Sequence, residues 1–72
     1  MIDFNMEKMG QRIKELRTDL GISQKELASR VGVAQNTIAQ YEKGTANTSL
    51  DILFKLARVF NITADYLLGL ID

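Results

Sequence analysis

Apolar residues recur at helical spacing in five segments of this chain, with short polar stretches between them. The first segment runs from about Met6 to Leu20 and follows Asn5, a suitable N-cap. Its apolar side chains are three or four residues apart, which places them on one side of a helix. They are Met9, Ile13, Leu16 and Leu20. The pattern predicts an amphipathic first helix.

Four further segments have the same periodicity. The second begins at Ser23 and stops at Gly32, the third covers about residues 35–42, the fourth begins after Ser49, and a short fifth follows Thr63. Glycine follows four of the five segments, where a residue with positive φ readily ends a helix. These glycines are Gly21, Gly32, Gly44 and Gly69. Gly10 differs, because it lies inside an apolar repeat and lowers helix propensity there by about 1 kcal/mol relative to alanine.

Two pairs of polar residues have the spacing of capping boxes. Ser23 and Glu26 would begin the second helix, and Thr48 and Asp51 would begin the fourth. In the fourth helix a wide apolar face is expected to be buried. Its members are Leu50, Leu53, Leu56, Ala57 and Phe60.

No segment alternates apolar and polar residues over more than a few positions, so no sheet is expected. The chain contains no internal repeat and no proline- or glycine-rich linker. The sequence therefore predicts an all-α fold, with five helices in one domain over residues 1–72 and a core over about residues 6–69.

Composition removes several classes of function. The 72 residues include no cysteine and no histidine, so the commonest metal ligands and the commonest general base are missing. No acidic cluster has the spacing of metal ligands, and no glycine-rich phosphate loop is present, so we expect no enzyme, no metal and no cofactor. No apolar run approaches the length of a membrane span, and no signal peptide or small-molecule pocket is evident. Absence of cysteine agrees with a cytoplasmic protein.

Charge gives no general attraction to nucleic acid, because nine basic and nine acidic residues leave a formal net charge of zero. Two helices joined by a short turn are nevertheless expected over residues 24–41. Ala28 permits close approach, Gly32 turns the chain, and Ile38 with Tyr41 anchors the third helix on the second. The opposite face of the third helix is then free to protrude.

This stretch resembles the helix-turn-helix of the phage-repressor and Cro-like family, and the chain is similar to lambda-repressor-like domains from about Met9 to Gly69. The resemblance lies in Ser23–Ala28, Val31–Val33 and Thr37–Gly44. It continues through Ser49–Leu50, Leu53, Leu56–Ala57 and Ile62–Gly69. It implies a compact five-helix domain that binds double-stranded DNA and regulates transcription. Members of the family usually bind near-palindromic sites as two-fold dimers, with the third helix in the major groove, and this chain is accordingly expected to be a dimeric repressor.

The resemblance also implies roles for residues of the third helix. Amide side chains present a donor and an acceptor together, which matches the major-groove edge of adenine. The face carries no arginine, so contacts with A·T pairs are expected. The positions that match the family's base readers are Gln35, Asn36, Ala39 and Gln40.

Other positions are expected to contact phosphates. The family uses a glutamine at the position of Gln24, beside the free N–H groups of a helix N-terminus. The loop that contains Asn47 lacks lysine, arginine and the proline that many relatives carry. The full set of expected phosphate contacts is Gln24, Thr37, Lys43, Asn47 and Arg12.

Two further expectations concern structure and assembly. Arg17 and Glu42 match a pair that joins the first and third helices in the family, and we expect a structural ion pair. The last residues are more apolar than a short helix needs for packing, which suggests a homodimer patch where the family often pairs. The patch comprises Tyr66, Leu68, Leu70 and Ile71.

Three alternatives remain open at this point. The same fold can serve as a protein-interaction module that uses its apolar C-terminal face. It can be the antitoxin of a toxin–antitoxin pair, which also binds DNA. It can also be the DNA-binding part of a longer repressor.

Overall fold

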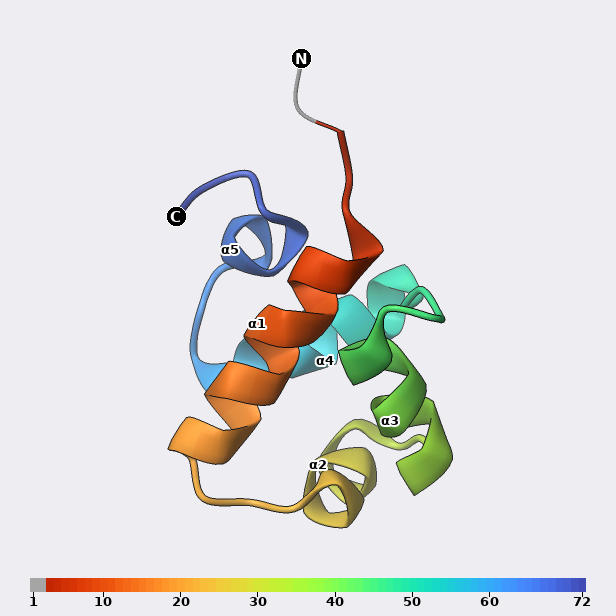
Figure 1. Ribbon diagram of the computed structural model, residues 1–72. Coiled ribbons are helices and arrows are strands. Elements are labelled where there is room, and N and C mark those ends of the chain that lie inside the picture. The colour runs from red at the N-terminus through yellow and green to blue at the C-terminus, as the bar shows by residue number, and fades with distance from the viewer. Residues whose placement is uncertain (1–2) are drawn as a thin grey trace.

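The computed structural model describes residues 3–72, and five helices form the fold in this range (Figure 1). The helices are α1 (Met6–Asp19), α2 (Gln24–Val31), α3 (Gln35–Lys43), α4 (Leu50–Phe60) and α5 (Ala64–Leu68). Residues 3–72 contain no strand, so the prediction of an all-α fold is confirmed. Residues 1 and 2 of the expected domain lie outside the described range.

The helices pack around one apolar core. α1 contacts α3 and α5, α2 contacts α3 and α4, and α5 also contacts α4. In Figure 1, α1 crosses in front of α4, while α2 and α3 lie together on one side of the molecule. The side chains that are almost fully buried come from all five helices. They are Met9, Ile13, Leu27, Val31, Ile38, Leu56 and Leu67.

Gly10 is required where α1 and α3 come closest. A Cβ atom placed on Gly10 would lie 2.2 Å from the backbone oxygen of Tyr41 and 2.8 Å from that of Glu42. These distances are far below van der Waals contact, and backbone atoms cannot rotate away as a side chain does. Only glycine fits at this position, so its low helix propensity is the cost of the close approach between α1 and α3.

Side-chain caps begin four of the five helices. Asn5, Ser23 and Thr63 accept hydrogen bonds from backbone N–H groups of the first turn, as their positions indicate. The expected cap of the fourth helix at Thr48 is wrong by one residue. Ser49 is the N-cap of α4, and its hydroxyl accepts a bond from the N–H of Ile52 at 3.2 Å.

Helix ends agree with the glycine pattern except in α4. Gly21, Gly32, Gly44 and Gly69 all have positive φ. Asn61 ends α4 with φ of 54°, a conformation that asparagine tolerates better than most residues. The pattern of glycines gave no signal for this fourth helix end.

The assignment of Leu50 to the core is also wrong. Leu50 is 86 % exposed, whereas Leu53 is 8 % exposed. Leu50 is the first residue of α4, and it shares the solvent side of that helix with Phe54, four residues later, which is 61 % exposed. Helical spacing from Leu50 is compatible with either side of α4, so the sequence pattern did not distinguish them.

The difference in burial between Leu50 and Leu53 predicts that alanine substitutions at the two positions will have different effects on stability. Leu50→Ala should change the free energy of unfolding by less than about 0.5 kcal/mol, because little apolar area returns to water. Leu53→Ala should lower it by about 2–5 kcal/mol, because it leaves a cavity in the core. Urea denaturation of both proteins measures these changes. Equal losses would place Leu50 in the core after all.

Candidate nucleic-acid interface

α2, a short turn and α3 form one unit through apolar contacts. Gly32 ends α2 in the left-handed conformation, and the N–H groups of Gly32 and Val33 both donate to the backbone oxygen of Ala28. Ile38 and Tyr41 of α3 are buried against this unit. Burial also raises the pKa of the Tyr41 phenol. The inner face of α3 is thereby fixed, and its orientation on α2 follows from packing.

The outer face of α3 is open to solvent. Gln35, Asn36 and Gln40 are exposed, while Ala39 is half-buried between them and the core side. None of these four side chains makes a hydrogen bond to another residue within residues 3–72. The structure therefore brings the expected base-reading residues together on one accessible surface.

Glu42 lies on the opposite side of α3, and its carboxylate joins three helices. Arg17 of α1 donates to it from Nε at 2.6 Å and from Nη2 at 3.2 Å. Gln24 of α2 donates to it from Nε2 at 3.0 Å. The side chain of Glu42 is only 4 % exposed and that of Arg17 is 12 % exposed. The expected pair between Arg17 and Glu42 is thus present and buried.

Arg17 also fixes the chain between α1 and α2. Its Nη1 donates to the backbone oxygen of Ile22 at 2.9 Å. The hydrogen bond to Glu42 raises the pKa of the guanidinium, so Arg17 stays charged throughout the physiological pH range. The charge of Glu42 is therefore compensated on the side of α3 that faces the interior.

Gln24 has a role that the sequence did not indicate. It occupies the first position of α2, but one of its two amide N–H groups is directed to Glu42. The second N–H group remains available to an outside acceptor, since an amide nitrogen carries two donors. The sequence pattern contained no signal for this contact, because it joins residues 18 positions apart.

The remaining expected phosphate contacts fall in two groups. Lys43 and Asn47 are exposed and Thr37 is half-buried, all in or just after α3. Arg12 lies elsewhere. Its side chain is 11 % exposed, and its guanidinium donates to backbone oxygens of Tyr66 and Ile71. This guanidinium is committed to the C-terminal segment, so the expectation that Arg12 contacts phosphate is not supported by its position.

Large apolar side chains are exposed on α4 and in the segment that follows α5, and also at Phe4 and Leu20 beside α1. Leu70 and Ile71 of the expected dimer patch are 51 % and 49 % exposed, while Tyr66 and Leu68 are half-buried. Leu50, which was expected in the core, and Phe54, which the sequence analysis did not name, add exposed apolar surface on α4. The spacing of four residues between them places the two on one side of a helix, but it does not say that this side faces solvent.

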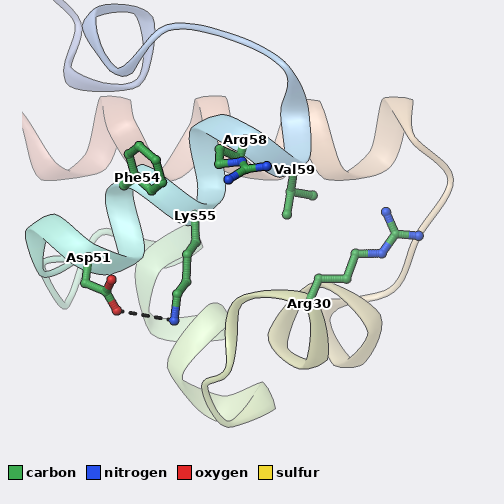
Figure 2. Close-up of a pocket in the computed structure, with 6 residues that line it drawn as sticks. All are labelled: Arg30, Asp51, Phe54, Lys55, Arg58 and Val59. Atoms are coloured by element: carbon green, nitrogen blue, oxygen red, sulfur yellow. Dashed lines mark ion pairs between the residues drawn. The ribbon is translucent and has the colours of Figure 1, made fainter.

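A hollow of about 380 Å³ lies between α2 and α4 and is lined by no residue of α3 (Figure 2). Figure 2 shows Lys55 directed toward Asp51, and Nζ of Lys55 lies 3.3 Å from Oδ2 of Asp51, while the Arg30 side chain extends from α2 away from this pair. Arg30 is itself paired with Glu26 of its own helix at 3.2 Å. Two of the three cations that line the hollow are therefore paired with carboxylates, and the guanidinium carbon of the third, Arg58, lies 5.9 Å from the centre of the Phe54 ring.

Residues 3–72 offer neither a metal site nor a membrane span of the following kinds. No group of three or more acidic, histidine or cysteine side chains is arranged to hold a metal ion. In the same range, none of the helices combines the length and the apolar character needed to cross a membrane.

The fold and the exposed face of α3 define a helix-turn-helix DNA-binding domain of the kind found in transcriptional regulators. The chain belongs to the helix-turn-helix family, whose model matches residues 13–67. This membership confirms the resemblance and agrees with the expectation that the chain is not an enzyme.

Individual relatives are consistent with this family. An uncharacterized helix-turn-helix-type transcriptional regulator of Archaeoglobus fulgidus is 53 % identical over 53 residues, which cover 74 % of this chain and 75 % of the relative. The helix-turn-helix-type transcriptional regulator ImmR of Bacillus subtilis is 38 % identical over 61 residues, covering 85 % of this chain and 48 % of ImmR. This chain thus spans about half the length of ImmR.

A solved structure gives the same fold. The P22 c2 repressor in complex with a synthetic operator is similar, with a TM-score of 0.81 and 35 % sequence identity. The match covers 83 % of this chain and 91 % of that chain. The expected lambda-repressor-like architecture is confirmed.

Proposed function

We propose that this chain binds specific sequences in double-stranded DNA and represses transcription. The observation that carries this proposal is the division of α3 into two faces. Ile38, Tyr41 and Glu42 fix the helix from the inside, and the outer face presents unpaired amides to solvent. The P22 c2 repressor, which has this fold, is bound to a synthetic operator in its solved structure, and this supports the assignment.

Base reading follows from the chemistry of the outer face. The side-chain amide of a glutamine or asparagine can donate to N7 of adenine and accept from its N6 amino group at the same time, and this applies to Gln35, Asn36 and Gln40. Each good bidentate pair discriminates by about 1–3 kcal/mol. The methyl group of Ala39 suits contact with a thymine methyl group. We therefore propose half-sites rich in A·T pairs.

Phosphate contacts would fix the register of α3 in the groove. We assign them to the second N–H group of Gln24 and to Thr37, Lys43 and Asn47. Only one of these side chains is cationic, so few counterions are released on binding. The affinity should accordingly depend less on salt than is usual for proteins of this class.

Dimer formation would double the contact with DNA. We propose a homodimer formed through Tyr66, Leu68, Leu70 and Ile71, with Leu50 and Phe54 as additional apolar surface. Two copies of α3 would then enter successive major grooves about 34 Å apart on a near-palindromic operator. A dimer seated over a promoter represses by occlusion. We propose the cytoplasm as its location, where bacterial and archaeal chromosomes are accessible.

Gln40→Ala tests the assignment of base reading. We expect a loss of about 1–3 kcal/mol, or roughly 5–150-fold, in affinity for the operator, because a bidentate contact is lost. Binding to unrelated DNA should stay within about twofold, since phosphate contacts are unchanged. Fluorescence anisotropy at fixed salt measures both. Gln11→Ala, at an exposed position of α1, is the matched control. Equal losses on both kinds of DNA would refute base reading by Gln40.

Selection of bound duplexes from a random library at near-physiological salt tests the whole proposal. Enrichment of an inverted repeat with half-sites about one helical turn apart would support a dimeric sequence reader. Absence of enrichment would favour the protein-interaction module, in which the exposed apolar side chains of α4 would contact another protein instead of a second copy of this chain.

A further inference from the structure

Arg12 makes an unusual set of contacts for a cation on the first helix. Its Nη1 donates to the backbone oxygens of Tyr66 and, at 2.7 Å, of Ile71. The guanidinium carbon lies 4.2 Å from the centre of the Tyr66 ring, and Nη2 lies 3.8 Å from Oδ1 of Asp72. One side chain therefore contacts the last turn of α5 and the irregular segment that follows it.

These contacts are not explained by a salt bridge alone. The Arg12 side chain is 11 % exposed, whereas the Asp72 side chain is fully exposed, so their attraction at 3.8 Å is weak. Removal of a guanidinium from water is compensated here by two carbonyls and an aromatic face. Arginine suits this site because its planar group donates in several directions and stacks at the same time.

The segment after α5 has few other attachments. Residues 70–72 are not helical, and the backbone hydrogen bond that holds them runs from the N–H of Leu70 to the oxygen of Asp65, at 2.9 Å. Leu70 and Ile71 nevertheless keep about half of their surface exposed. Arg12 fixes the backbone on one side of this segment, and the apolar side chains remain accessible.

We propose that Arg12 is a positioning residue that holds residues 70–72 in the conformation in which Leu70 and Ile71 bind a second copy of this chain. This inference rests on the dimer described under Proposed function. Without the contacts of Arg12, the segment would have to be ordered at the moment of association, and each immobilised residue would reduce the affinity. Arg12 then acts on DNA binding through the dimer and touches no phosphate.

The test uses Arg12→Gln and Arg12→Lys in the 72-residue chain, with Arg30→Gln as the control for charge at an exposed arginine. Backbone ¹⁵N relaxation of residues 66–72 reports order. Sedimentation equilibrium reports the dimer dissociation constant. Affinities for a full operator and for a half-site, measured at one salt concentration, report DNA binding.

For Arg12→Gln we expect order parameters of residues 70–72 to fall from about 0.85 to below about 0.6. The dimer dissociation constant should rise about tenfold, and full-site affinity should fall by a similar factor while half-site affinity stays within about twofold. Arg12→Lys should restore less than half of the loss, since lysine lacks the planar fork. Arg30→Gln should leave all four measurements unchanged.

Two results would overturn the inference in distinguishable ways. If the unmodified chain dimerises and Arg12→Gln dimerises equally well, Arg12 has no positioning role and the proposed dimer stands. If the unmodified chain is monomeric at all accessible concentrations, the dimer itself is wrong. If Arg12→Gln fails to fold, Arg12→Lys carries the same measurements, and dimerisation equal to that of the unmodified chain would again refute the inference.

Discussion

Glu42→Gln should lower the free energy of unfolding by about 3–5 kcal/mol, which is a large part of the stability of a domain this small. The substitution keeps the shape of the side chain and removes its charge. Arg17 would then remain almost buried without its counterion, and its Nε–H would still point at the place that the carboxylate occupied. Urea denaturation followed by circular dichroism measures the effect, and the slope m should stay constant.

Glu26→Gln is the matched control for this substitution. Glu26 also pairs with an arginine, Arg30, at 3.2 Å, but both side chains are about half exposed. Solvent screens such a pair, so we expect a loss of no more than about 0.5 kcal/mol. The comparison isolates burial as the cause. Similar losses in both variants would show that the network around Glu42 contributes no more than a surface ion pair.

Gly10→Ala should destabilise the fold by at least about 2 kcal/mol, which corresponds to a fall of roughly 8–16 °C in Tm. Helix propensity alone predicts the opposite sign, a gain of about 1 kcal/mol. Contact decides between these effects, because the new Cβ would lie 2.2 Å from a backbone oxygen of α3. α1 and α3 must move apart to accommodate it.

Thermal unfolding by calorimetry measures this change, with Gln11→Ala on the same helix as the control. Gln11 is exposed, so its substitution should alter Tm by no more than a few degrees. A Tm for Gly10→Ala at or above that of the unmodified chain would mean that α1 and α3 are farther apart in solution. Operator affinity should fall together with stability, since α3 carries the proposed base-reading residues.

Local signals predicted most of the fold correctly. The periodicity of apolar residues located all five helices, and the glycines with positive φ marked where most of them end. The family resemblance supplied the pair of Arg17 with Glu42. The register of the α4 cap was misjudged because Thr48 and Ser49 are adjacent hydroxyl residues and both suit an N-cap. In the structure Ser49 is the N-cap, with an extended backbone, and its side chain accepts the hydrogen bond from the first turn of α4.

Contacts between distant segments were not predictable in the same way. Arg12 is one of several exposed-looking cations of the first segment, and its burial depends on where residues 66–72 pass, more than 50 positions later. The prediction that Leu50 is buried was wrong for a related reason. Helical spacing shows which residues share one side of a helix, but it does not show which side another helix covers. Gln24 was expected to contact DNA, but its side chain also donates a hydrogen bond to the buried carboxylate of Glu42.

The separation of the two faces of α3 bears on how such a protein changes its target. The four side chains of the outer face contribute no hydrogen bond to the fold within residues 3–72, and three of them are exposed. Mutations there should therefore have little effect on the stability of the fold. During evolution, such substitutions can change the operator that the protein binds without producing variants that fail to fold. The same property makes α3 a graft site, where a new set of outer residues can be installed on an unchanged scaffold to redirect the regulator to another promoter.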